Sequence, residues 1–261
     1  PKSIVITGTN GKSTTCKIIE QLLKKNNKDV KICGNIGKPI LSLNQGKKSF
    51  FIIEASSFQL SYAKFIKPDY AIILNISNDH LDWHGSVKNY IDSKLKIFSL
   101  QDKNCFAFLS NKILIRKFKS NSYLSKLFIV KSSTYQKIKK NIKNNYLRSR
   151  VNEENMSFAF SLSKSLKINN RNFFKSFNAF KGLPHRHEIF YKKKNIKFIN
   201  DSKATSFAST KFSLQSNNNI FWIVGGLPKL GDKFYLNNLK KKIIKSYIIG
   251  KNVNFFGNEL K

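Results

Sequence analysis

The opening stretch IVITGTNGKSTT (residues 4–15) constrains the fold more than any other part of the chain. A β-branched apolar run leads into a loop with two glycines, and a helical pattern follows over residues 12–25. A strand, a glycine-rich loop and a helix in this order are typical of a phosphate site with Mg²⁺. The general pattern G-x-x-x-x-G-K-[ST] would need a glycine at Ile6, so the loop is a shorter variant. The residues predicted to hold phosphate are Gly8, Thr9, Asn10, Gly11, Lys12, Ser13 and Thr14.

Strand-like and helix-like segments alternate along the rest of the chain. The strands expected in the first part lie at 3–7, 29–33, 50–55, 69–76, 105–109 and 126–130, and the helices at 12–25, 86–100, 152–168 and 171–180. Such alternation predicts an α/β fold, a parallel sheet covered by helices on both faces. After GLPHRHE (182–188) a second, shorter α/β unit is expected, with a helix over 235–244. We therefore expect a P-loop parallel-sheet domain over 1–182, followed by a partial Rossmann-like α/β domain over 183–261.

Several of the few acidic residues follow predicted strands. Glu54 closes the apolar run FFII, and Asp79 and His80 come soon after the run AIILNI. Open α/β sheets bind ligands at the carboxyl ends of their strands, and Mg²⁺ prefers hard oxygen ligands. The simpler alternatives are that Glu54 faces the N-terminus of the next helix and that His80 is an ordinary polar residue. Together with the glycine-rich loop, the pattern favours a metal and phosphate site.

The charge of the chain admits two interpretations. Lysine and arginine total 48 against 14 acidic residues, which gives a formal charge of +34. Such a charge attracts nucleic acid, but lysine, asparagine, isoleucine and phenylalanine are over-used throughout, as AT-rich coding produces. The lysines are scattered and arginine, the better base reader, is scarce, so no specific nucleic-acid partner is expected. No apolar run approaches the length of a membrane span, so we expect a cytoplasmic protein without membrane contact.

The sequence resembles the ATP-dependent Mur ligases of bacterial peptidoglycan synthesis. The resemblance to their central domain rests on GTNGKST, NISNDHLD (75–82) and DSKLKIF (92–98). Other stretches resemble the members that add D-glutamate to UDP-N-acetylmuramoyl-L-alanine, namely GNIGKP (34–39), EASSFQL (54–60), GLPHRHE and INDSKATS (199–206). The phosphate loop alone would also admit another Mur-type ligase or a folylpolyglutamate synthase. A basic nucleic-acid-binding ATPase has only the charge in its support.

The resemblance implies an amide ligase that acts as a monomer in the bacterial cytoplasm. It would use ATP and two Mg²⁺ ions to activate the alanyl carboxylate of UDP-N-acetylmuramoyl-L-alanine as an acyl-phosphate, which D-glutamate attacks, releasing ADP and phosphate. Residues 1–182 would be the central ATP-binding domain and 183–261 an incomplete C-terminal domain. The N-terminal UDP-binding domain of the family would be absent from this chain.

The resemblance also assigns roles to individual residues. Lys12, His80 and Lys94 would be catalytic. Ser13 and Glu54 would bind one metal ion and His80 the second, and Lys94 would be carbamylated to serve as a metal ligand. The remaining ATP contacts would come from Asn152, Asn155, Arg186, Asp201 and Lys203, and the substrate contacts from Asn35, Ser56, His80 and Lys229. Around Asn152 the chain departs from the family, with Val151 and the pair Glu153–Glu154 in place of a small residue and a histidine.

Overall fold

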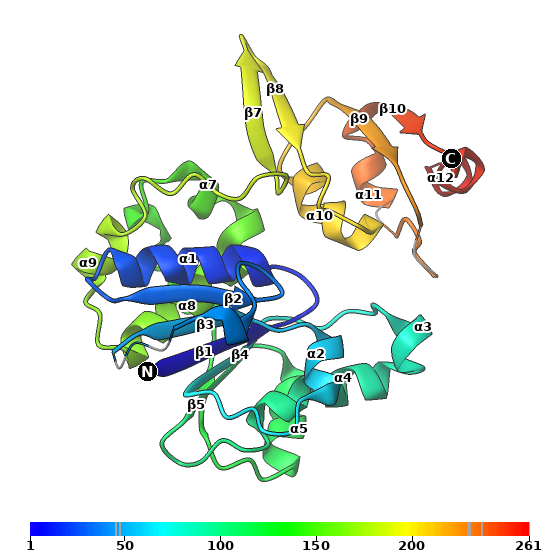
Figure 1. Ribbon diagram of the computed structural model, residues 1–261. Coiled ribbons are helices and arrows are strands. Elements are labelled where there is room, and N and C mark those ends of the chain that lie inside the picture. Colours follow the sequence, from blue (N-terminus) through cyan, green and yellow to red (C-terminus); the bar gives the residue numbers. More distant parts are fainter. Residues whose placement is uncertain (45, 47, 229–230, 236, 261) are drawn as a thin grey trace. The chain divides into compact units, whose positions relative to one another are not determined.

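The chain folds into two compact units, each with its own hydrophobic core. The computed structural model describes residues 1–44, 46, 48–228, 231–235 and 237–260 (Figure 1). The first unit comprises Pro1–Arg148 and Asn152–Lys181, and the second comprises Ser149–Val151 and Gly182–Lys261. Lys229, a predicted substrate residue, lies outside the described residues.

A six-stranded sheet forms the centre of the first unit. Its strands are β1 (Lys2–Thr7), β2 (Val30–Gly34), β3 (Phe50–Glu54), β4 (Tyr70–Ile73), β5 (Phe106–Leu109) and β6 (Lys126–Ile129). Their order in the sheet is β2-β3-β1-β4-β5-β6, and every neighbouring pair is parallel. The α/β class and the parallel sheet predicted from the sequence are therefore confirmed.

Helices cover both faces of this sheet (Figure 1). They are α1 (Lys12–Lys24), α2 (Ser57–Tyr62), α3 (Leu81–His84), α4 (Val87–Leu95), α5 (Lys112–Ser120), α6 (Ser132–Gln136), α7 (Asn145–Arg148), α8 (Glu153–Ser165) and α9 (Asn170–Lys175). Successive side chains of a strand point to opposite faces, so Ile4 and Ile6 pack with α1 and α8. Val5, between them, packs with α2, α4 and α5. The sheet is thus buried on both faces, which explains its nearly continuous apolar strands.

The strand register places the predicted site. Ile6 of β1 pairs with Glu54 of β3 on one side and with Ile72 of β4 on the other. The carboxyl ends of these three neighbouring strands therefore lie level, and the loops that follow them meet at one edge of the sheet. That edge includes the point where the chain crosses from one half of the sheet to the other, the usual position of a ligand in open α/β folds.

The second unit is smaller and contains two separate strand pairs. Its elements are β7 (Glu188–Lys193), β8 (Ile196–Asn200), α10 (Phe207–Gln215), β9 (Ile220–Gly225), α11 (Asn237–Lys240), β10 (Ile243–Ile249) and α12 (Val253–Leu260). Strands β7 and β8 form an antiparallel hairpin, whereas β9 and β10 are parallel. The core is formed by Phe207, Leu214, Phe234, Leu239 and Phe256.

The helix predicted over 235–244 is wrong in its second half. Within 235–244 the helix is limited to α11, which ends at Lys240. Strand β10 begins at Ile243, which pairs with Ile220 of β9. A β-branched isoleucine fits a paired strand better than the end of a lysine-rich helix. The helix predicted over 86–100 is α4, which tightens into a 3₁₀ turn at Lys96–Phe98. Among the described residues, no helix is both long and apolar enough to span a bilayer.

Candidate functional site

The loop after β1 requires its two glycines. Gly8 has a φ of 149° and Gly11, directly before α1, has a φ of 84°, a region that side chains with a Cβ avoid. A Cβ on Gly11 would also lie 2.4 Å from Oδ1 of Asn155, a buried residue of α8. Gly11 stands at the N-cap of α1 and no side chain of the described residues caps this helix end, which is therefore suited to an anion. The local geometry agrees with a phosphate-binding loop.

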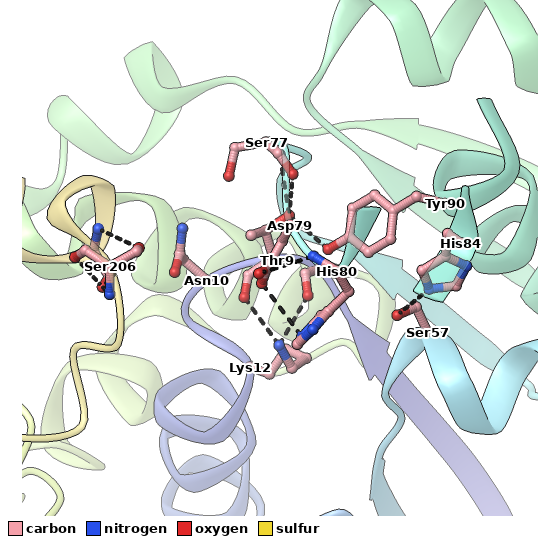
Figure 2. Close-up of polar contacts among 12 residues, drawn as sticks. Thr9, Asn10, Lys12, Ser57, Ser77, Asp79, His80, His84, Tyr90 and Ser206 are labelled. Carbon is pink, nitrogen blue, oxygen red and sulfur yellow. Dashed lines mark hydrogen bonds and ion pairs between the residues drawn. The ribbon is translucent and has the colours of Figure 1, made fainter. Parts of the chain in front are cut away.

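Lys12 folds back over this loop. Its Nζ donates hydrogen bonds to the carbonyl oxygens of Gly8, at 2.9 Å, and of Thr9, at 3.0 Å (Figure 2). The ammonium charge is therefore held above the loop, at the N-terminus of α1. Ser13 and Thr14 follow in the first turn of the helix and are buried. This part of the site brings together the residues that the motif predicted.

Glu54 ends β3 as a buried carboxylate, only 2% exposed. Its Oε1 accepts a hydrogen bond of 3.0 Å from Nδ2 of Asn35, which follows β2. Its Oε2 finds no hydrogen-bond partner among the residues that the structure describes. A buried carboxylate oxygen without a partner is costly, and a hard cation such as Mg²⁺ would satisfy it. The donor set at Glu54 therefore fits a divalent metal ion, and Asn35 orients that carboxylate.

Lys94 is the second lysine at the loop, and it is buried, with 1% exposure. Its Nζ lies 3.2 Å from the carbonyl oxygen of Gly8 and 3.3 Å from Oγ1 of Thr7, over the ring of Tyr90. Burial, and secondly the charge of Lys12, lowers the pKa of Lys94 to about 7. A large part of this amine is therefore uncharged at neutral pH, unlike an ordinary surface lysine.

Tyr90 reaches the same loop from one turn earlier in α4. Its hydroxyl lies 2.9 Å from Oγ1 of Thr9, and burial raises its pKa to about 12 (Figure 2). Tyr90 was not among the residues predicted from the sequence to form the site. The available signal was its spacing of four residues from Lys94, which puts both side chains on one face of a helix.

His80 stands at the edge of this group of residues. It has a φ of 52°, directly before α3, and its Nε2 lies 3.5 Å from Oδ2 of Asp79. The ring packs edge-on against Phe58, with 4.8 Å between centroids. No three His, Cys, Asp or Glu side chains gather into a ready metal site within the described part of the chain. The metal role of His80 stays a prediction.

Structural contacts are made by Ser56, by Asn155 of α8 and by Asn152, which directly precedes that helix. Ser56 caps α2 in a capping box with Gln59. Asn155 accepts a hydrogen bond from Thr15 at 3.1 Å and donates one to Oδ1 of Asn152 at 3.1 Å. Both asparagines are buried behind the start of α1. Their predicted contacts with adenine, and that of Ser56 with the substrate, stay predictions.

The predicted nucleotide residues of the second unit take part in local contacts. Asp201 accepts hydrogen bonds from the backbone N–H of His187, at 2.8 Å, and from Ser213. The backbone N–H of Lys203 donates to the carbonyl oxygen of His185 at 3.1 Å. Arg186 lies between these two histidines, just before β7. The ATP contacts of Arg186, Asp201 and Lys203 stay predictions.

Comparison with known proteins decides the family. Residues 6–179 match the Mur ligase middle domain. The chain belongs to the Mur ligase family. It is 32% identical over 277 residues to the UDP-N-acetylmuramoylalanine–D-glutamate ligase of Rickettsia felis. This alignment covers 99% of the chain and 62% of that ligase. The ligase of the same name from Bartonella henselae is 34% identical, over 95% of this chain and 58% of its own length. The chain thus spans about three fifths of the length of these Mur ligases.

Solved structures of Mur ligases share the fold. MurF ligase from Thermotoga maritima, in complex with ADP, aligns with a TM-score of 0.70 at 18% identity, over 94% of this chain and 70% of that protein. E. coli FolC in complex with ADP aligns with a TM-score of 0.63 at 13% identity, over 100% of this chain and 79% of that one. At such identities these structures support the fold of this Mur ligase chain and nothing more specific.

Proposed function

We propose that this chain is the nucleotide-binding part of an ATP-dependent ligase that joins D-glutamate to UDP-N-acetylmuramoylalanine in peptidoglycan precursor synthesis. The observation that carries the nucleotide half of the proposal is the loop at the carboxyl end of β1, with two lysines and a buried carboxylate around it. The substrate half rests on the relatives that match 95–100% of the chain, which are ligases of that name.

In this proposal the loop and the start of α1 bind the β- and γ-phosphates of ATP. Backbone N–H groups at a helix N-terminus favour negative charge, and Lys12 neutralises charge that develops during phosphoryl transfer. Ser13 and Glu54 would hold one Mg²⁺ ion, and His80 and Lys94 the second. When bound, these ions would neutralise the phosphate oxygens. The unpartnered Oε2 of Glu54 supports this assignment.

Lys94 would first have to become a carboxylate. An uncharged ε-amine attacks carbon dioxide, the new N–C bond forms, and the nitrogen loses one proton to solvent, which leaves a carbamate of charge −1. The lowered pKa of Lys94 favours this step because the amine must be uncharged to attack. The burial of Lys94 against Thr7 and Gly8 would then hold the carbamate at the phosphate loop.

The chemistry would proceed by two substitutions. A carboxylate oxygen of UDP-N-acetylmuramoylalanine attacks the γ-phosphorus, the bond to the β-phosphate oxygen breaks, and ADP leaves. The amine of D-glutamate then attacks the acyl carbon, phosphate leaves, and the nitrogen loses a proton. We expect Asn35, Ser56, His80 and Lys229 to contact substrate, and Asn152 and Asn155 to contact adenine. Arg186, Asp201 and Lys203 would complete the nucleotide site.

Two assays test the proposal. Titration of the chain with Mg-ATP in a calorimeter should give saturable binding that is lost in Lys12→Ala and retained in Lys17→Ala, a lysine of the same helix paired with Glu20. A protein that contains this chain and has the full length of its Mur ligase relatives should release ADP in the presence of UDP-N-acetylmuramoylalanine and D-glutamate together. Release with folate and glutamate instead would assign the chain to the folylpolyglutamate synthases. An absence of Mg-ATP binding would contradict the proposal.

A further inference from the structure

Asn75, which follows β4, makes several hydrogen bonds to the tip of the phosphate loop. Oδ1 of Asn75 accepts a hydrogen bond of 2.8 Å from the backbone N–H of Asn10, and its Nδ2 donates one of 3.2 Å to the carbonyl oxygen of Asn10. The backbone oxygen of Asn75 accepts a further bond of 3.0 Å from the N–H of Thr9. Asn75 therefore fixes two consecutive residues of the loop.

Glu154 in turn fixes Asn75. Its Oε2 accepts a hydrogen bond of 2.5 Å from Nδ2 of Asn75, and Glu154 lies in the first turn of α8. An ionised carboxylate can only accept hydrogen bonds, so the amide of Asn75 must turn its NH₂ group toward Glu154. Its Oδ1 is then left for the N–H of Asn10. Burial raises the pKa of Glu154, and the hydrogen bond from Asn75 opposes that rise.

The neighbouring Glu153 has different partners. It accepts hydrogen bonds from Gln136 and from Nζ of Lys139, the latter at 3.4 Å, and these lie on the segment before α8. Two adjacent residues of the same type thus serve different parts of the structure. Only Glu154 is connected to the phosphate loop, and Glu153 offers a matched control.

We propose that Glu154 is a positioning residue of the phosphate loop, which acts through the side chain of Asn75 to hold Asn10 in the shape that binds phosphate. The inference rests on the proposed nucleotide role of this loop. A loop that is already ordered loses less conformational freedom when the ligand binds. Removal of Glu154 should therefore weaken nucleotide binding even though Glu154 acts indirectly, through Asn75. Because Asn152 directly precedes α8 and Asn155 lies in its first turn, α8 would link the phosphate loop to the predicted adenine contacts.

Calorimetric titration with Mg-ADP tests this role in the 261-residue chain. Glu154→Leu should raise the Kd about tenfold, the scale of one hydrogen bond to a charged group. Glu154→Gln, whose amide oxygen can still accept from Asn75, should stay within about threefold of the parent, and Glu153→Leu should bind as the parent does. With Asn75→Ala already present, Glu154→Leu should change the Kd less than about twofold, since the residue through which it acts is gone.

Two results would overturn the inference. The first is a parental Kd in Glu154→Leu, including the case in which only the melting temperature falls. The second is that Glu154→Leu raises the Kd by the same factor in the parent chain and in Asn75→Ala. A parent chain that does not bind Mg-ADP would contradict the proposed function instead. Amide exchange at Asn10 then tests the positioning role without nucleotide: Glu154→Leu should speed it about tenfold, and exchange equal to that of Glu153→Leu would overturn it.

Discussion

The two units of the molecule place their polar side chains differently. In the first unit, a sheet covered on both faces brings ionisable groups from β3, α1 and α4 into a partly buried cluster around one loop. In the second unit, one face of the β9–β10 pair is exposed, with the side chains of Phe221, Ile223, Tyr247 and Ile249. Asp201 there accepts a hydrogen bond from the nearby backbone N–H of His187. The comparison indicates that the low pKa of Lys94 comes from its deep burial in the first unit.

The largest expected effect is the loss of stability when a large side chain is removed from one of the two separate cores. Phe207 packs against Trp222, Phe234, Phe255 and Phe256, so Phe207→Ala should destabilise the second unit by about 3–5 kcal/mol. Hydrogen exchange should then accelerate in β9 and β10 and stay unchanged in β1 and β4. Phe158→Ala, in the core of the first unit, should show the reverse pattern. Equal loss of protection in both units after either change would break the comparison.

The loop lysine should have the next largest effect. Lys12→Ala should weaken Mg-ATP binding by roughly 100-fold, the upper end of what a hydrogen bond to a charged group contributes. Lys203→Ala, in the second unit, should cost less than about tenfold, because a single exposed lysine makes a weaker contribution. Titrations of both variants under the same salt conditions measure the difference. If Lys203→Ala had the larger effect, the second unit would hold the phosphates and our assignment would be wrong.

Lys94 should give the first unit a distinctive pH dependence. The pKa of this amine is about 7 in the folded chain and near 10.5 when it is exposed, so between these values the unfolded state binds more protons. The free energy of unfolding should therefore rise with pH in this window, by up to about 1.4 kcal/mol per pH unit, and fall as pH drops toward 7. Lys94→Met should lack this contribution.

Urea unfolding of the parent chain and Lys94→Met at pH 7, 8 and 9 in carbon dioxide-free buffer measures the difference in slope. Removal of carbon dioxide matters because a carbamate would replace the titrating amine. Parallel pH profiles for the two proteins would show that the Lys94 amine titrates as an ordinary lysine does. The burial argument for Lys94 would then fail.

Asp201 should give the smallest effect. An amide at this position keeps one acceptor for the N–H of His187, so Asp201→Asn should destabilise the second unit by about 1 kcal/mol. Faster exchange in β7 and β8 would report it. Asp102→Asn, which removes an exposed pair with Lys67 from the first unit, should change stability by less than this. A loss of several kcal/mol in Asp201→Asn would mean that this carboxylate organises far more than the hairpin.

The sequence predicted the parts of the structure that depend on local pattern. The strand before the loop, the glycines at 8 and 11 and the lysine at 12 are specified by neighbours in the chain, and all lie where they were expected. The features that were missed depend on distant partners. Tyr90 looks like part of an apolar helical face until Thr9 is placed beside it, and Asn75 and Glu154 are 79 residues apart. Lys94 was assigned only through the family resemblance, because the burial that lowers its pKa is a property of the tertiary fold.

The most direct test of the central claim is a crystal structure of the chain with Mg²⁺ and a non-hydrolysable ATP analogue. The account predicts that the β- and γ-phosphates lie on the loop Gly8–Thr14, with Nζ of Lys12 within hydrogen-bond distance of a phosphate oxygen and a metal ion bound by Ser13 and Oε2 of Glu54. Phosphates bound elsewhere on the chain, with Lys12 still on the carbonyl oxygens of Gly8 and Thr9, would contradict it.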